Sequence, residues 1–177
     1  LRLSSAASDV YKRQSLNVNL PQKLKINKFS SDILNQKWDL IVIAVSSIGI
    51  DLIGKNLSKI KNKSPILVLT KGPKLDGRNL ISMSSLLKKY NKNLNISVLK
   101  GPCLAKELAK KVKSFTVVAN KNINTAKKIG KLISTNYYQT EFSRDVNGVE
   151  FLSAIKNIYS MIIGCLLYTS PSPRDPR

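Results

Sequence analysis

Apolar residues along the middle of the chain fall into short continuous runs separated by amphipathic segments. The runs are typical of strands buried on both faces of a sheet, and they occupy residues 39–45, 66–70, 96–100 and 115–120. Between them, apolar residues recur at helical spacing and predict helices over residues 50–60, 80–90, 104–112 and 126–133. Residues 137–142 predict a short edge strand. Strands that alternate with helices predict a parallel α/β sheet with right-handed crossovers.

The pattern changes after Arg144, where alternation stops. Val149–Gly164 predicts one long and strongly apolar helix, and we expect a domain boundary near Asp145. The apolar run Ile158–Tyr168 is too short to cross a bilayer, so we expect no membrane span.

The two ends of the chain are related to each other at the level of DNA. Asp9–Gln14 reads DVYKRQ, and a back-translation of it, reverse-complemented and shifted by one base, encodes Cys165–Ser170, CLLYTS. Both resemble translated transposon-end adapters of sequencing libraries. We therefore expect residues 1–14 and 165–177 to be non-native and exclude them from fold reasoning. What remains is a sheet domain over 15–144 and the start of a helical domain over 145–164.

The chain is strongly basic, with 30 Lys and Arg against 10 Asp and Glu and a net charge of +20. Between residues 15 and 164 all the basic residues except Arg78 and Arg144 are scattered lysines, and Asn and Ile are abundant, as AT-rich codons favour. Proteins that read nucleic acid favour arginine and stacking aromatics, so we interpret the charge as surface solvation and expect no nucleic-acid partner.

The composition also excludes some chemistry. With no His, the chain has no Ser–His or Cys–His catalysis and no His-dependent metal site, and we expect no metal. Setting Cys165 aside leaves Cys103 alone, which excludes an intrachain disulfide and indicates a reducing compartment.

Two loops follow predicted strands, at the end where ligands bind in open α/β sheets. Lys71-Gly72 combines a cation with a glycine that allows close backbone approach, and Lys100–Cys103 leads directly into a predicted helix whose N-terminus favours an anion. For both loops the alternative is an ordinary surface turn with solvated lysines. Without a His to activate it, Cys103 is more simply a small, half-buried thiol than a nucleophile.

Lys156 is the only charged residue between Phe151 and Ile163. Such a lysine must extend to solvent, pair with an acid, or sit in a cavity that lowers its pKa, as catalytic lysines do. The residues leave these alternatives open. Asn157 beside it adds an amide that could orient a ligand.

Taken together, the segments DLIVIAVSS, ILVLTKG, KGPCLAKELA, FTVVAN and DVNGVEFLSAIKNIYSMIIG resemble the NAD(P)-dependent glycerol-3-phosphate dehydrogenase family, from about Leu20 to Gly164. The resemblance implies a truncated Rossmann-type domain, without its opening strand, Gly-rich turn and helix, followed by the first helix of an all-α substrate domain. It implies a fragment that is inactive alone, from a cytoplasmic enzyme that allows a homodimer at full length.

The resemblance also implies site residues for reversible hydride transfer between NAD(P)H and dihydroxyacetone phosphate, giving sn-glycerol 3-phosphate for phospholipid synthesis. The cofactor is NAD or NADP. The implied roles are proton transfer by Lys156, cofactor contacts by Lys71 and Ala105, and substrate contacts by Lys71, Gly101, Cys103 and Asn157. Cys103 and Ser46 depart from the family pattern, which has Ser or Thr and Pro there.

Two alternatives remain at this point. One is a dehydrogenase of the same superfamily that acts on a 2- or 3-oxo acid. The other, from a different class, is a non-catalytic basic module that binds nucleic acid.

Overall fold

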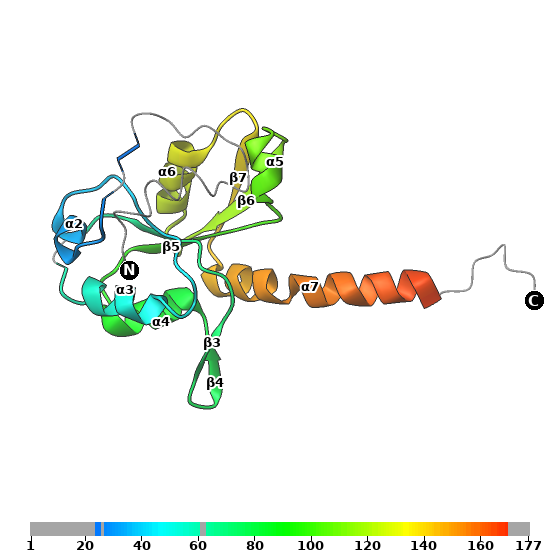
Figure 1. Cartoon of the computed structure of the whole chain (residues 1–177), viewed down its shortest axis with the longest axis horizontal. Coiled ribbons are helices and arrows are strands. Elements are labelled where there is room, and N and C mark those ends of the chain that lie inside the picture. The colour runs from blue at the N-terminus through cyan, green and yellow to red at the C-terminus, as the bar shows by residue number, and fades with distance from the viewer. Residues whose placement is uncertain (1–23, 26, 61–62, 170–177) are drawn as a thin grey trace, which may run out of the picture.

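The computed structural model describes residues 24–25, 27–60 and 63–169. Its centre is a sheet with the strand order β1-β2-β5-β6-β7 (Figure 1). These strands are β1 (Ile41–Ile43), β2 (Ile66–Val68), β5 (Ile96–Lys100), β6 (Ser114–Ala119) and β7 (Tyr138–Ser143). The four predicted strands are confirmed, and so is the short edge strand, because β7 forms one edge of the described sheet. At the other edge β1 is not buried on both faces as predicted, since Val42 is 50% exposed.

The prediction of an all-parallel sheet is wrong at one pairing. β1, β2 and β5 are mutually parallel and β6 is parallel to β7, but β6 runs antiparallel to β5. The reason lies in the connection, whose helix α5 (Ala105–Ala109) has only five residues. Such a helix spans about 7.5 Å, whereas a strand of the same number of residues spans about 17 Å. The chain therefore does not return to the start of β5 and pairs back along it.

Helices cover both faces of the sheet. On one face, α3 (Ile50–Leu57), α4 (Met83–Tyr90) and the first turns of α7 (Val146–Thr169) pack against a core that includes Val68 and Val98. On the other face, α6 (Ile123–Ile133) buries Ala126 and Ile129 against Leu67 and Val118. Alternate residues of each strand thus serve opposite cores, as the pleat requires.

Two small elements were not predicted. The first is α2 (Ser31–Asn35), capped by the Ser30 side chain. The second is a hairpin of β3 (Lys74–Asp76) and β4 (Asn79–Ile81), which takes the first residues of the helix predicted from residue 80. Gly77 turns the hairpin with φ 62°, and the Asp-Gly pair there is a known hairpin signal.

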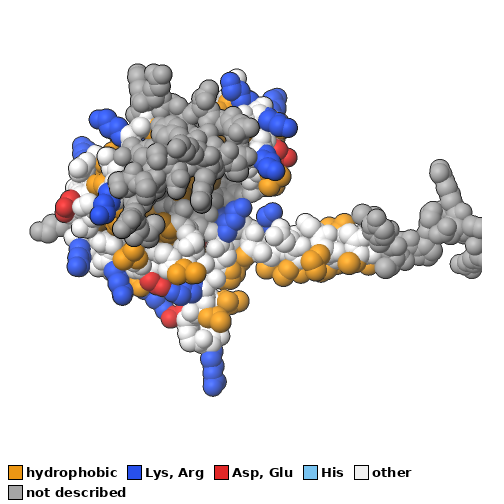
Figure 2. Space-filling view, viewed as in Figure 1, with side chains coloured by type: hydrophobic (Ala, Val, Ile, Leu, Met, Phe, Trp, Pro, Cys, Tyr) orange, Lys and Arg blue, Asp and Glu red, His pale blue; other side chains and the backbone are white. Residues whose placement is uncertain are grey.

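The helix α7 leaves the body of the molecule and projects as a rod (Figure 1). Apolar side chains line its projecting part (Figure 2), among them Leu152, Ile158, Met161 and Leu166, all exposed. By length and composition alone, the 21 residues Val146–Leu166 are long and apolar enough to cross a membrane, and 6% of an 18-residue window within them is buried. The apolar run of residues 158–168, which alone is too short to cross a bilayer, is only part of this helix. Helices of soluble proteins share this length and composition.

The predicted non-native ends are described only in part. Residues 165–169 continue α7 without a break after Gly164. Residues 1–14 and 170–177 lie outside the described residues.

Candidate active site

Polar groups tie the carboxyl ends of three strands together. Lys100, the last residue of β5, is only 5% exposed, and its Nζ donates to the carbonyl oxygen of Thr70 and, at 3.5 Å, to that of Leu69. The Thr70 hydroxyl in turn donates to the carbonyl oxygen of Val45 at 2.8 Å. The backbone that follows β1 and β2 is thereby fixed to the end of β5.

The loop after Thr70 is open to solvent. Lys71 is exposed, and Gly72 has φ 84°, a conformation that favours glycine. A Cβ added at Gly72 would have no atom within 4 Å. The predicted cation and glycine thus lie at a strand end where a ligand can approach the backbone closely.

The helix α7 runs along β5 from its amino end toward its carboxyl end. Val146, in the first turn, lines a small hollow of about 180 Å³ together with Ile96, the first residue of β5. One turn later Glu150 is buried and accepts hydrogen bonds from the Ser84 amide, at 3.2 Å, and from the Ser84 hydroxyl. Glu150 anchors α7 to the N-terminal turn of α4.

The charges of this region act on Lys100. Its burial lowers the pKa of Lys100 below the ordinary value, the Glu150 carboxylate opposes that change, and the nearby Lys71 charge lowers the pKa further. Lys71 and Glu150 are therefore both electrostatic neighbours of Lys100.

Lys156 and Asn157 lie on the projecting part of α7, and both are exposed. Lys156 follows Glu150 by six residues, which is about 9 Å along a helix axis. Of the environments that the sequence left open for Lys156, the described residues provide solvent rather than a cavity.

The loop from Gly101 to Ala105 lies on the β6 side of β5, whereas Lys71 lies on the β2 side. Gly101 packs so closely on β6 that a Cβ would lie 2.8 Å from the Phe115 carbonyl oxygen. Cys103 is half-buried and electrostatically close to Tyr138, the first residue of β7: burial chiefly raises the pKa of Tyr138, and Cys103 adds to that rise. Ala105 is exposed at the start of α5, where Leu104 provides no side-chain cap.

The structure therefore brings some of the predicted residues together and separates others. Lys71 lies beside the end of β5 on the β2 side, whereas Cys103 lies on the β6–β7 side. The sequence placed Lys100 in a candidate loop but did not predict its burial, and it did not single out Glu150. The burial of Lys100 could have been found, because Ile96 and Val98 share its face of β5 and both are buried.

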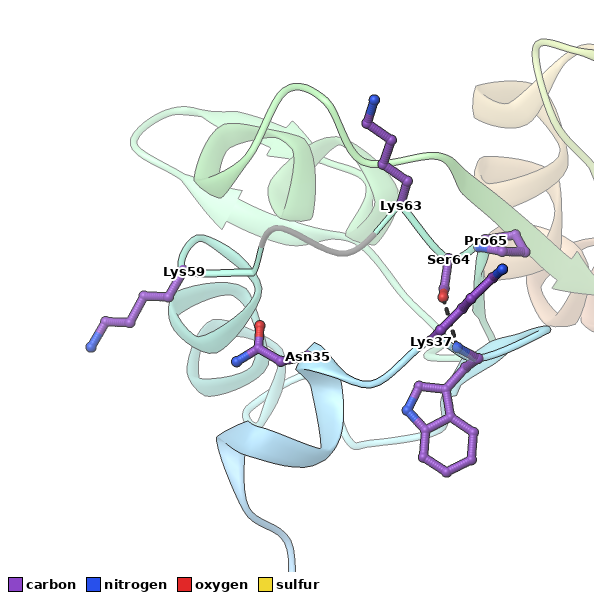
Figure 3. Close-up of a pocket in the computed structure, with 7 residues that line it drawn as sticks. Asn35, Lys37, Lys59, Lys63, Ser64 and Pro65 are labelled. Atoms are coloured by element: carbon purple, nitrogen blue, oxygen red, sulfur yellow. Dashed lines mark hydrogen bonds between the residues drawn. The ribbon is translucent and has the colours of Figure 1, made fainter.

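A larger hollow, of about 810 Å³, lies at the opposite, amino edge of β1 and β2 (Figure 3). It is lined by Lys37, Lys59 and Lys63 among others, and the Trp38 amide donates to Ser64 Oγ across it at 2.9 Å. Figure 3 shows Lys59 and Lys63 pointing in different directions, so these cations do not converge on one point. Nor do the described residues contain a group of three or more Cys, Asp or Glu that could hold a metal ion.

Comparison with known proteins gives the family. The sequence model described as the N-terminus of NAD-dependent glycerol-3-phosphate dehydrogenase matches residues 8–126. The chain belongs to this family. A glycerol-3-phosphate dehydrogenase [NAD(P)+] of Leptospira biflexa is 34% identical over 149 residues, which cover 82% of this chain and 44% of the relative. One of Neorickettsia sennetsu is 32% identical over 130 residues, covering 73% of this chain and 38% of the relative. The chain thus spans less than half the length of either relative.

Solved structures of the family confirm the fold. A glycerol-3-phosphate dehydrogenase of Saccharomyces cerevisiae superposes with a TM-score of 0.75 at 19% identity, over 90% of this chain and 49% of that one. One of Coxiella burnetii gives 0.72 at 22% identity, over 90% and 50%. The predicted Rossmann-type α/β architecture followed by a helix is confirmed, with the mixed sheet as the correction.

Proposed function

We propose that this chain carries the dinucleotide-binding part of an NAD(P)-dependent glycerol-3-phosphate dehydrogenase, which interconverts dihydroxyacetone phosphate and sn-glycerol 3-phosphate. The observation that carries the proposal is the family match over residues 8–126. A reducing, cytoplasmic compartment suits it, because Cys103, the one cysteine of the segment expected to be native, forms no disulfide.

The carboxyl edge of the sheet fits an anionic dinucleotide. Such a ligand needs a positive charge and close backbone approach, and Lys71 with the open Gly72 offers both. Lys71 and Ala105 would hold the cofactor. When bound, the nicotinamide supplies a hydride to the carbonyl carbon of the substrate.

The residues of this chain would bind the substrate and move the proton. The Lys156 ammonium donates a proton to the carbonyl oxygen as the alcohol forms, and in the reverse direction the neutral Lys156 amine takes the hydroxyl proton. Asn157 orients the oxygen, and Lys71 attracts the phosphate. Gly101 and Cys103 would complete the substrate contacts from the loop after β5.

The course of α7 supports the assignment of Lys156. Glu150 is an electrostatic neighbour of Lys100 at the carboxyl end of β5, so the helix continues past that edge toward Lys156. Lys71 and Lys156 would thus face the same edge of the sheet.

The test is a steady-state assay of the product of the complete reading frame that contains these residues. Oxidation of NADH or NADPH is followed with dihydroxyacetone phosphate and, separately, with a panel of 2- and 3-oxo acids. We expect turnover on the phosphate and little on the acids. Turnover on an oxo acid alone would overturn the proposal.

A further inference from the structure

Lys100 is a buried lysine that has no part in the proposed proton transfer. Removing an ammonium group from water is costly unless hydrogen bonds and an opposite charge compensate. At 5% exposed, Lys100 bears this cost, and its pKa is lowered chiefly by that burial. A methionine of similar length would fill the same space without the cost of burying a charge, which indicates that the amine has a role of its own.

The acceptors of Lys100 lie directly before the predicted ligand-binding loop. The regular pairing of β2 ends at Val68, and Leu69 continues it with an amide that donates to the Ile43 carbonyl at 2.9 Å. The carbonyl of Thr70, the last before Lys71, is then held by Lys100 Nζ. Lys71 itself is exposed and Gly72 faces open space, so Thr70 is the residue at which the sheet holds the loop, by its carbonyl at Lys100 and by its hydroxyl at the Val45 carbonyl.

The opposite charge comes from α7. Glu150 is buried, is fixed by two hydrogen bonds from Ser84, and raises the pKa of Lys100 against the effect of burial. Lys100 therefore donates hydrogen bonds to the backbone directly before the Lys71 loop and is an electrostatic neighbour of Glu150 on the helix that carries Lys156.

We propose that Lys100 is a positioning residue, whose amine holds the Thr70 carbonyl and thereby fixes the Lys71-Gly72 loop on the edge of the sheet. The order of the loop does not depend on the proposed function. The effect on catalysis rests on it.

The loop is tested in the 177-residue chain by backbone ¹⁵N relaxation. In Lys100→Met, the order parameters of Lys71 and Gly72 should fall from about 0.85 to below about 0.6, and the body of the sheet should keep its values. Lys106→Met, an exposed lysine on α5, is the matched control and should change neither. A folded Lys100→Met chain whose loop order is unchanged overturns the proposal.

A wild-type measurement covers the case in which Lys100→Met does not fold. A buried and hydrogen-bonded ammonium exchanges its protons slowly, so Lys100 should give a distinct ¹⁵Nζ resonance with nuclear Overhauser contacts to the protons of Leu69 and Thr70. Absence of those contacts contradicts the proposal without any variant.

The catalytic consequence is measured on the enzyme from the complete reading frame. We expect Lys100→Met to lower kcat/KM for dihydroxyacetone phosphate at least tenfold, mainly through KM, with partial rescue in Lys100→Arg, which keeps donors at this position. If the wild type does not turn over this substrate, the proposed function fails while the relaxation result still decides the loop. If the loop loosens in Lys100→Met and KM stays constant, the link to catalysis fails.

Discussion

At the scale of single residues, Lys156 carries the proposed chemistry. Proton transfer by a positioned group contributes about 10²–10⁴-fold to a rate. We therefore expect Lys156→Ala to lower kcat of the complete enzyme by roughly that factor, because no other described charge lies between Phe151 and Ile163. Lys113→Ala, at an exposed lysine before β6, is the control. An unchanged kcat in Lys156→Ala would refute the assignment.

Lys100 gives a prediction on pH. Its folded-state pKa lies below the ordinary 10.5, chiefly because of burial, so between these two values the unfolded chain binds the proton more strongly than the folded chain does. In that interval the wild type should gain stability relative to Lys100→Met as pH rises. Urea unfolding of both chains at several alkaline pH values measures the difference. A wild type that loses stability relative to Lys100→Met as pH rises would contradict the expected direction.

The sequence predicted those features of the site that neighbouring residues determine, and not those that depend on contacts between distant residues. Lys71 follows an apolar run, so its place at a strand end was predictable. The contact between Glu150 and Ser84 joins residues 66 apart in sequence, and no local pattern encodes it. The environment of Lys156 depends on what surrounds α7, which its own apolar neighbours do not determine.

At the scale of elements, Asn120 fixes the end of β6 to the start of β5. It is buried, and its side-chain amide donates to Asn95 Oδ1, to the Ile96 carbonyl and to Ser97 Oγ, at 2.7–3.1 Å. Asn120→Ala leaves buried acceptors without this donor, so we expect a loss of about 1–3 kcal/mol in the free energy of unfolding. Asn124→Ala, at an exposed position in α6, should change it by less than about 0.5 kcal/mol. Equal effects of the two would contradict this role.

The sequence predicted the type of an element well where its hydrophobic pattern extended over many residues. It predicted strand direction poorly, because direction depends on the length of the connection between two strands. The apolar runs predicted the strands, because a strand in the interior of such a sheet reads as a continuous run of apolar residues. The direction of β6 depends instead on the length of α5, and the pattern over residues 104–112 predicted a longer helix than the five residues observed. The strands of the β3–β4 hairpin have only three residues each, too few for an alternating pattern to identify them.

At the scale of the whole molecule, α7 divides into a packed start and an exposed rod. Val146, Val149 and Glu150 contact the body, whereas the residues from Lys156 to Ile163 are all exposed. Ending the chain after Ile155 should therefore change the free energy of unfolding by less than about 1 kcal/mol, because little buried area is lost. Ending it after Arg144 should lower it by more than about 2 kcal/mol. Urea unfolding of both truncated chains measures this, and a loss as large as about 2 kcal/mol in the chain that ends after Ile155 would show that the rod stabilises the body.

The order of the last three strands has a consequence for how the chain folds. β5, β6 and β7 are neighbours both in sequence and in the sheet, whereas β2 pairs with β5 across an intervening hairpin and helix. Contacts between residues close in sequence form faster, so we expect the β5–β7 half to be structured first in the folding transition state. Val118→Ala and Val68→Ala, both at fully buried positions, test this, with a higher φ-value expected for Val118. On the ribosome, the half of this sheet that emerges last would then be the one that starts its assembly.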